Sequence, residues 1–269
     1  MHVHAFDRYQ EGHSLVHRLD PRVKVSITFL FILSNLLLPD GAWIGFSLAW
    51  GLVLLGSALS HLGLSYLLKR SIIALPFALA AASVLFSLPG QSIAQMSLGP
   101  LHLEMTDAGL LRFSSILVRS WLSVQMAVLL VATTQFPDLL HALRHLHVPG
   151  VLVSIISFMY RYLFVLSDEA MRLLRARQAR SAAAAGEGNG GGSLAWRARV
   201  TGAMVGQLFL RSYERSDRIY NAMLARGYTG ALLTLNPHIM TDRDWVVLSL
   251  VLLILSSIQG IARLATAIG

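Results

Sequence analysis

Two arginines in the second half of the chain lie near predicted helix ends, where they could bind a partner protein. They belong to Ala176-Arg177-Gln178 and Ala225-Arg226-Gly227. Gly227 suits the left-handed conformation that commonly terminates a helix, so we expect Arg226 at a helix tip. A guanidinium stays charged and offers a planar fork of donors that matches carboxylates. Two such tips on one segment could hold two equivalent subunits.

Two groups of histidines have spacings that could bind a metal ion. His141 and His145 share a helix face with His147 nearby, but no carboxylate completes a site, and we interpret them as histidines at the membrane interface. In Met1-His2-Val3-His4, the terminal amine, a backbone nitrogen and the imidazole of His2 could bind a late transition metal. We assign no metal site and no catalytic residue to this chain.

Several kinds of chemistry are excluded by residues that the sequence lacks. It contains no cysteine, which excludes disulfides, thiolate metal sites and thiol nucleophiles. No G-x-x-x-x-G-K-[ST] loop occurs, so the chain cannot bind ATP as a P-loop ATPase does. The predicted spans described below hold serines but no Asp, Glu or His, which excludes an intramembrane enzyme.

The composition is that of an integral membrane protein. Of 269 residues, 55% are hydrophobic and only 13% are charged, whereas charge is near a quarter in soluble domains. The net charge of +8 comes from arginine, since Lys24 and Lys69 are the only lysines among 22 basic residues. Nucleic acid is excluded as a partner because the arginines alternate with aliphatic residues on helices joined to spans. Anionic lipid and an acidic protein partner stay open.

Five helical spans are predicted from apolar stretches that approach the roughly 20 residues needed to cross a bilayer. Asp20-Pro21 forms a start signal for the first span, and Pro76 is expected to kink the third. Residues 89–109 are predicted to form a polar loop. Arg119 is costly at membrane depth unless it snorkels or pairs inside the bundle, and we interpret it as an interfacial arginine near the outer end. The spans are 23–38, 42–59, 71–88, 110–134 and 245–262.

A sixth apolar stretch, 148–166, is predicted not to cross. With a cytoplasmic N-terminus, crossing would place eleven arginines of 168–244 outside, against the positive-inside rule. We therefore predict a partly buried amphipathic helix at the cytoplasmic boundary. The predicted fold is an all-α membrane protein with about five transmembrane helices, six being possible, and long cytoplasmic amphipathic coupling helices.

Three regions follow from this pattern: 1–135 with four spans, a cytoplasmic region 136–244, and 245–269 with the last span. Two long helices, 151–180 and about 194–225, flank a glycine-rich linker at 186–192. The second helix should pair Glu214 with Arg218 at i, i+4. Its apolar stripe comprises Val205, Phe209, Tyr213, Tyr220 and Met223.

Nearly the whole chain resembles a known family, the transmembrane T component of energy-coupling factor (ECF) transporters, in particular the cobalt-type member CbiQ. Besides the two arginine motifs, the resemblance rests on five short segments. They are Gly12-His13-Ser14, His17-Arg18-Leu19-Asp20-Pro21-Arg22-Val23-Lys24, Phe136-Pro137-Asp138-Leu139-Leu140, Leu146-His147-Val148-Pro149 and Tyr160-Arg161-Tyr162.

The resemblance implies a non-catalytic coupling subunit. In the family, two Ala-Arg-Gly motifs end helices that dock into two cytoplasmic ABC-type ATPases; the motif at Arg226 matches fully, whereas Gln178 replaces the first glycine. ATP would be bound by the ATPases, and Co²⁺ by a membrane substrate-binding subunit, with a small accessory membrane subunit as a further partner. The implied function is cobalt import across a bacterial inner membrane. A nickel or vitamin importer is the alternative, since no residue here distinguishes them.

Overall fold

The computed structural model describes residues 9–74, 76, 80–87, 89, 91–98, 101–146, 148–180, 193–230 and 240–268. Internal contacts divide the chain into two compact units. We call the first the bundle, which holds Asp7–His145 and Asn236–Gly269, and the second the arm, within Leu146–Leu235. Among the described residues, every element of secondary structure is a helix except one β-hairpin, which confirms the predicted all-α membrane fold class.

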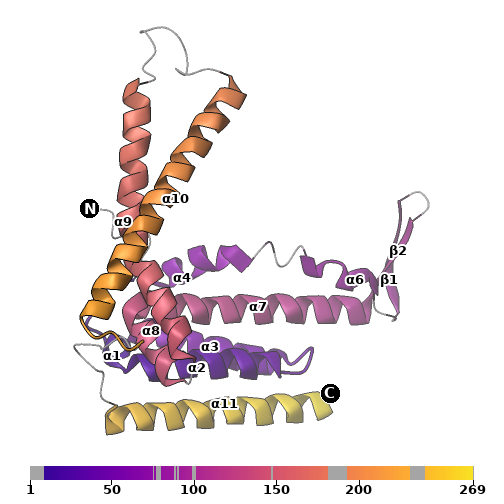
Figure 1. Ribbon diagram of the computed structural model, residues 1–269. Helices are drawn as coiled ribbons and strands as arrows, with labels where there is room; N and C mark the ends of the chain where they lie inside the picture. Colours follow the sequence, from indigo (N-terminus) through magenta and orange to yellow (C-terminus); the bar gives the residue numbers. More distant parts are fainter. Residues whose placement is uncertain are drawn as a thin grey trace. The chain divides into compact units, whose positions relative to one another are not determined.

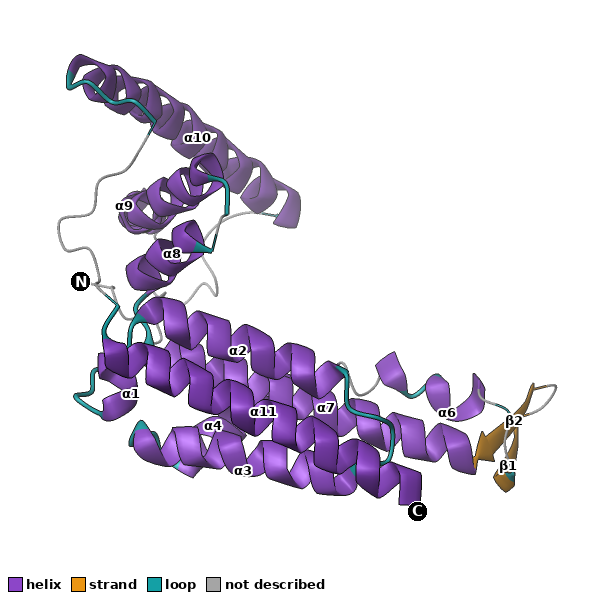
Figure 2. Cartoon of the chain, turned by 90° about the horizontal axis from the view of Figure 1, so that it is seen from below, coloured by secondary structure: helices purple, strands orange, loops and turns teal. Residues whose placement is uncertain are grey.

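Four helices form the body of the bundle and lie side by side (Figures 1 and 2): α2 (Pro21–Leu36), α3 (Trp43–Leu59), α7 (Asp107–Thr133) and α11 (Asp242–Ile268). The predicted start of the first span is confirmed, because the Asp20 side chain accepts a hydrogen bond from the backbone N–H of Arg22 at 2.8 Å. By length and composition, α7 and α11 can cross a membrane, and α3 is a shorter apolar helix. Two small helices, α1 (Leu15–Arg18) and α8 (Phe136–His145), belong to the same unit.

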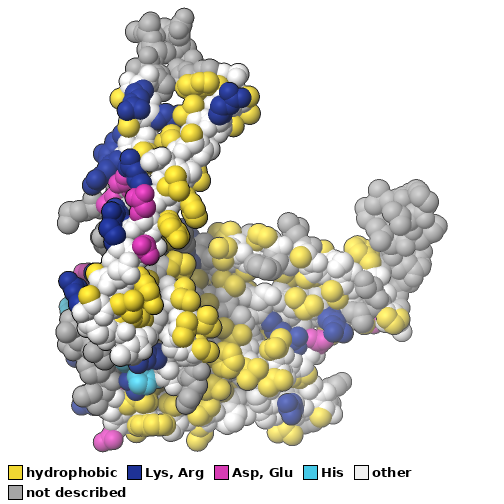
Figure 3. Space-filling model, in the orientation of Figure 1, with side chains coloured by type: hydrophobic (Ala, Val, Ile, Leu, Met, Phe, Trp, Pro, Cys, Tyr) yellow, Lys and Arg dark blue, Asp and Glu magenta, His cyan; other side chains and the backbone are white. Residues whose placement is uncertain are grey.

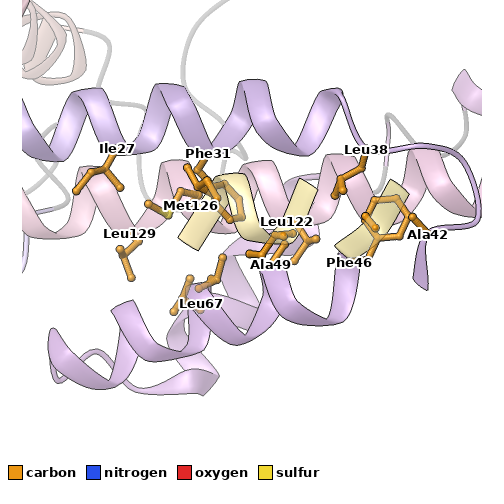
Figure 4. Close-up of a cluster of buried hydrophobic side chains, with 14 of the residues drawn as sticks. Ile27, Phe31, Leu38, Ala42, Phe46, Ala49, Leu67, Leu122, Met126 and Leu129 are labelled. Carbon is orange, nitrogen blue, oxygen red and sulfur yellow. The ribbon is translucent and has the colours of Figure 1, made fainter. Parts of the chain in front are cut away.

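The bundle has one hydrophobic core to which all four helices contribute (Figure 4). Phe31 of α2, Val53 of α3 and Leu122 of α7 are almost fully buried. Large apolar side chains also cover the outside, with Phe29, Leu55 and Leu253 each at least 60% exposed. Helices that are apolar on both the inner and outer faces are typical of membrane bundles.

The predicted third span, 71–88, is not one kinked helix. The described residues form separate short elements: α4 (Leu64–Ser71), the 3₁₀ turn η2 (Ile72–Ala74) and α6 (Val84–Ser87). The proline ring of Pro76 conflicts with the carbonyl four residues earlier, that of Ile72, where the α-helix has given way to the 3₁₀ turn. Pro76 itself is helical, but residues 75 and 77–79 lie outside the described residues, so the kink at proline stays a prediction.

The predicted polar loop at 89–109 is also wrong in part. Strands β1 (Ser92–Leu98) and β2 (Leu101–Thr106) pair antiparallel, with Met96 opposite Leu103 and an irregularity between Ser92 and Ala94. The overlooked signal was the alternation of apolar and polar residues from 101 to 106. Thr106 then caps α7 by accepting a hydrogen bond from the N–H of Gly109 at 3.1 Å.

The arm consists of two long helices, α9 (Gly150–Arg180) and α10 (Leu194–Ala225), which confirms both predicted helices. They run antiparallel, because Glu169 contacts Arg211 while Arg177 contacts Thr201. The predicted linker at 186–192 lies outside the described residues. By length and composition α9 could also cross a membrane, so the choice between five and six spans stays a prediction.

Candidate functional site

The end of α10 presents Arg226 on a fully formed capping motif. Gly227 has φ +78°, and its N–H donates to the carbonyl of Leu224 at 3.0 Å. The N–H of Tyr228 donates to the carbonyl of Met223, also at 3.0 Å. These two bonds define a Schellman motif and confirm the predicted helix end at glycine. Arg226 is the capping residue and is exposed.

The first arginine motif has a different geometry. Helix α9 continues through Ala176, Arg177 and Gln178 to Arg180, so Gln178 does not terminate it. Arg177 is half-buried, and its Nη1 donates to Oγ1 of Thr201 on α10 at 3.4 Å. Arg177 therefore faces the partner helix, whereas Arg226 makes no ion pair or side-chain hydrogen bond within the described part of the chain.

The two arginines occupy opposite ends of the arm. Arg177 lies beside Thr201, and Arg226 ends the same helix 25 residues after Thr201. At about 1.5 Å per residue, the two motifs are separated by roughly 35–40 Å. They cannot converge on one small site, and each instead marks its own end of the arm.

An ion pair holds the two arm helices together between these ends. Glu169 of α9 accepts from Arg211 of α10 at 2.5 Å, and the carboxylate side chain is only 19% exposed. The expected pair between Glu214 and Arg218 is not formed within the described residues, since no contact within 4.0 Å joins them. The prediction failed because an i, i+4 pair at an exposed helix surface contributes only a few tenths of a kcal/mol.

The apolar stripe of α10 is left uncovered within the arm. Phe209 and Tyr213 are each 66% exposed. With α9 they line a groove of about 650 Å³. Its other principal lining residues include Ile155, Met159, Tyr162, Tyr220 and Met223. A contiguous apolar surface of this kind is a candidate interaction site.

The N-terminal motif forms a small hydrogen-bonded structure at one end of the bundle. Ser14 Oγ lies 2.7 Å from Nδ1 of His17, and Nε2 of His17 lies 3.1 Å from the carbonyl of Gln10. Nε2 must therefore donate, and Nδ1 accepts from the serine hydroxyl. A Cβ on Gly12 would lie 2.8 Å from Cε1 of this ring, so only glycine fits there. Partial burial lowers the pKa of His17, and the positive charge of Lys24 acts in the same direction.

Two side chains connect this motif to the rest of the bundle. Lys24 is buried, and its Nζ donates to the carbonyls of His17 and Thr133 at 3.1 and 3.0 Å. Asp244, at the start of α11, accepts from the backbone N–H of Asp20 at 3.1 Å. The segment that resembles the family motif thus joins the beginnings of α2 and α11 to the end of α7.

The histidines of α8 show no metal-site geometry. The rings of His141 and His145 are edge to face with centroids 4.8 Å apart, and Nη2 of Arg22 lies 3.2 Å from Nε2 of His141. Within the described residues no group of three potential ligands is arranged to hold a metal ion. The histidines at positions 2, 4 and 147 lie outside the described residues.

Comparisons with known proteins point to one family. The family model for CbiQ, a cobalt transport protein, matches residues 12–239. The transmembrane protein EcfT of the energy-coupling factor transporter of Thermosediminibacter oceani is 28% identical, over 83% of each chain. That of Lacticaseibacillus paracasei is 29% identical over 89% of this chain and 91% of its own. An uncharacterized protein of Methanocaldococcus jannaschii is 27% identical over 84% of this chain and 76% of its own. Because the family model covers most of the sequence, this protein belongs to the CbiQ family of ECF transporter transmembrane components.

Proposed function

We propose that this chain is the coupling subunit of an ECF-type ABC importer for cobalt ions in a bacterial inner membrane. Two cytoplasmic ATPases bind and hydrolyse ATP, and a membrane substrate-binding subunit, with or without a small accessory subunit, binds Co²⁺. This chain catalyses nothing itself and transmits ATPase motion to the substrate-binding subunit. The observation that carries the proposal is the placement of Arg177 and Arg226 at opposite ends of the arm.

The spacing of the two arginines suits two ATPase subunits. With the motifs roughly 35–40 Å apart, each subunit occupies one end of the arm. Arg226 has no ion-pair or side-chain hydrogen-bond partner within the described residues, so its guanidinium can form a bidentate pair with a carboxylate of the ATPase. Arg177 must exchange its long contact with Thr201 for such a pair. When the ATPases close on ATP, they tilt or turn the arm, and its helices carry this motion to the membrane.

The groove between α9 and α10 supports a role for the arm in binding the membrane subunit. Its uncovered apolar side chains, Phe209 and Tyr213 among them, fit an apolar helix of a membrane partner better than they fit water. Arm motion would then reach the substrate-binding subunit by direct contact. The Glu169–Arg211 pair, near the middle of both helices, keeps them moving as one body.

Charge reversal of the two arginines tests this proposal. Arg177→Glu and Arg226→Glu should each weaken co-purification of the ATPases, and the double variant should abolish it together with ATP-driven Co²⁺ uptake. Arg218→Glu is the matched control, because Arg218 is exposed on the same helix and is in neither motif. Normal co-purification and uptake by the double variant would refute the proposal.

Nickel or vitamin transport is the alternative, and uptake by the whole transporter distinguishes it. Purification with untagged partners, followed by identification of the bound proteins, gives the substrate-binding subunit. Uptake assays with Co²⁺, Ni²⁺ and vitamins in proteoliposomes then assign the substrate. Preference for Ni²⁺ would leave the coupling role intact and replace only the cargo.

A further inference from the structure

The end of the arm nearest the linker is strongly basic. It comprises the last turns of α9 and the first turns of α10, and Figure 3 shows dark blue side chains on both helices there. No Asp or Glu occurs in 170–180 or 193–210. We call the exposed residues of this end the linker-end patch: Arg172, Arg175, Arg180, Arg199, Leu194 and Trp196.

Two arginines of the patch lie on a different face of α9 from the ATPase-coupling arginine proposed above. Arg172 and Arg175 are three residues apart and share one face of α9. Arg177 follows at 100° per residue on nearly the opposite face, where it contacts Thr201. Arg172 and Arg175 thus lie away from the face of α9 on which Arg177 contacts α10.

The charges of the patch are not neutralised within the described part of the chain. Arg172, Arg180 and Arg199 form no ion pair there, and Arg175 donates only to the backbone carbonyl of Met171 at 3.3 Å. In contrast, Arg211 further along α10 is paired with Glu169. An uncompensated basic surface is expected to attract an anionic one.

Two apolar side chains lie among these arginines. Leu194, the first residue of α10, is 85% exposed, and Trp196 is 41% exposed. An indole ring prefers the headgroup region of a membrane, where its apolar body and its N–H are both satisfied. Arginine together with tryptophan and leucine at a helix end is the composition of a segment that lies on a membrane surface.

We propose that the linker-end patch binds the anionic phospholipid headgroups of the membrane that holds the bundle. A headgroup surface supplies negative charge over a wide area and requires no shaped pocket, which fits arginines spread over several faces of two helices. The apolar groove, where a protein helix would bind, is lined from Val151 to Leu166 and from Phe209 onward, away from this end. The proposal rests on the cytoplasmic placement of the arm in the proposed function.

The consequence is that one end of the arm is held at the membrane surface before any ATPase binds. Each basic residue near an anionic surface strengthens binding about fivefold. Because the chain joins the arm to the bundle both before α9 and after α10, the headgroups lie at a high effective concentration. Headgroup binding therefore orients the arm: Arg172 and Arg175 face the headgroups, and Arg177 lies on the opposite face of α9.

Fluorescence of the full chain in nanodiscs tests the proposal. Since the chain has no cysteine, Ala195→Cys can be labelled specifically with an environment-sensitive dye next to Trp196. In discs that contain phosphatidylglycerol, we expect a blue-shifted emission and quenching by a lipid-borne quencher. In discs of phosphatidylcholine alone, or in high salt, both effects should be lost. A dye at Ala222→Cys, near the other end of α10, is the positional control.

Two pairs of arginine-to-glutamine variants, one inside the patch and one outside it, test whether the patch charges bind the headgroups. Arg172→Gln with Arg199→Gln removes one patch charge from each helix and should lower the ratio of bound to free arm roughly thirtyfold. Arg161→Gln with Arg218→Gln removes the same charge from both helices outside the patch and should leave the ratio unchanged. The Arg172/Arg199 variant should still co-purify with the ATPases, whereas Arg226→Glu should lose them and keep the lipid signal.

Two results would overturn the proposal. One is an emission that is the same in phosphatidylglycerol and phosphatidylcholine discs. The other is a patch variant that loses the ATPases while lipid composition has no effect, because the patch would then be a protein-docking surface. The proposed function is tested separately. It fails if the Arg177/Arg226 double variant still binds the ATPases and still supports uptake.

Discussion

Arg119 of α7 forms an ion pair with Asp40, in the loop between α2 and α3, with Nη2 and Oδ1 2.8 Å apart. Its guanidinium also donates to the carbonyl of Leu38 and lies 5.8 Å from the ring of Phe46. The pair is the alternative to the interfacial, snorkelling arginine that we predicted. The charge is thus satisfied where the α2–α3 loop meets α7.

Removal of this arginine should destabilise the bundle. Arg119→Ala leaves Asp40 without its close partner and is expected to cost about 1–3 kcal/mol of unfolding free energy, since both side chains are partly exposed. Arg112→Ala is the control, because Arg112 lies 3.9 Å from the same carboxylate and its side chain is 55% exposed. It should cost less than about 0.5 kcal/mol. Unfolding in mixed detergent micelles measures both, and equal costs would contradict the assigned pair.

The fit of Gly12 under His17 predicts a strong coupling between these residues. In the wild-type chain, Gly12→Ala forces the imidazole away from Gln10 and Ser14 and should cost about 1–3 kcal/mol. In a His17→Ala background the same change meets no ring and should cost less than about 0.5 kcal/mol. A double-mutant cycle measures the difference. Equal costs in both backgrounds would show that the close approach is not what requires glycine.

Stability should also depend on pH through His17. Its pKa is lowered in the folded chain, chiefly by burial, so the unfolded chain binds a proton more readily. The stabilisation is complete above the unfolded pKa of about 6.5 and is lost as pH falls below it. Unfolding free energies measured between neutral pH and about pH 5 should fall less steeply for His17→Gln than for the wild-type chain. An unchanged slope would show that His17 does not titrate as described.

The end of α10 offers a comparison of two glycines on one helix. Gly227→Ala must place a side chain at φ +78° and should destabilise the Schellman motif by about 1–2 kcal/mol. Gly206→Ala adds a methyl group in the helix interior, where nothing lies within 4 Å, and should stabilise α10 by up to about 1 kcal/mol. Hydrogen exchange of amides near residue 225 measures both effects, and they should have opposite signs.

Local features of the fold were predictable from the sequence. The cap at Asp20 and the helix end at Gly227 depend on a few neighbouring residues, and both predictions are confirmed. The long helices α9 and α10 followed from apolar periodicity and a glycine-rich interruption. In the candidate site, the exposed tip at Arg226 followed from the same local signals, although its role in coupling stays a prediction.

Features that depend on distant residues were not predictable. Asp40 and Arg119 are far apart in sequence, so only the fold chooses between pairing and snorkelling. Arg177 lies in the last turns of α9 as expected, but its contact with Thr201 depends on how α10 returns alongside. The role of Lys24 in joining α1 to the end of α7 has no sequence signal beyond a basic residue in an apolar helix.

The number of spans gives the last prediction, because α9 is long and apolar enough to cross while its arginines oppose crossing. With five spans and a cytoplasmic N-terminus, Ser193 lies inside and Thr266 outside; with six, the two positions exchange sides. In intact cells, an impermeant maleimide should therefore label Thr266→Cys and should label Ser193→Cys only after the membrane is opened. Gln91→Cys, predicted to lie outside in both topologies, is the positive control. Labelling of Ser193→Cys in intact cells, with Thr266→Cys protected, would establish six spans and place the arm outside, which would also remove the ATPases as its partners.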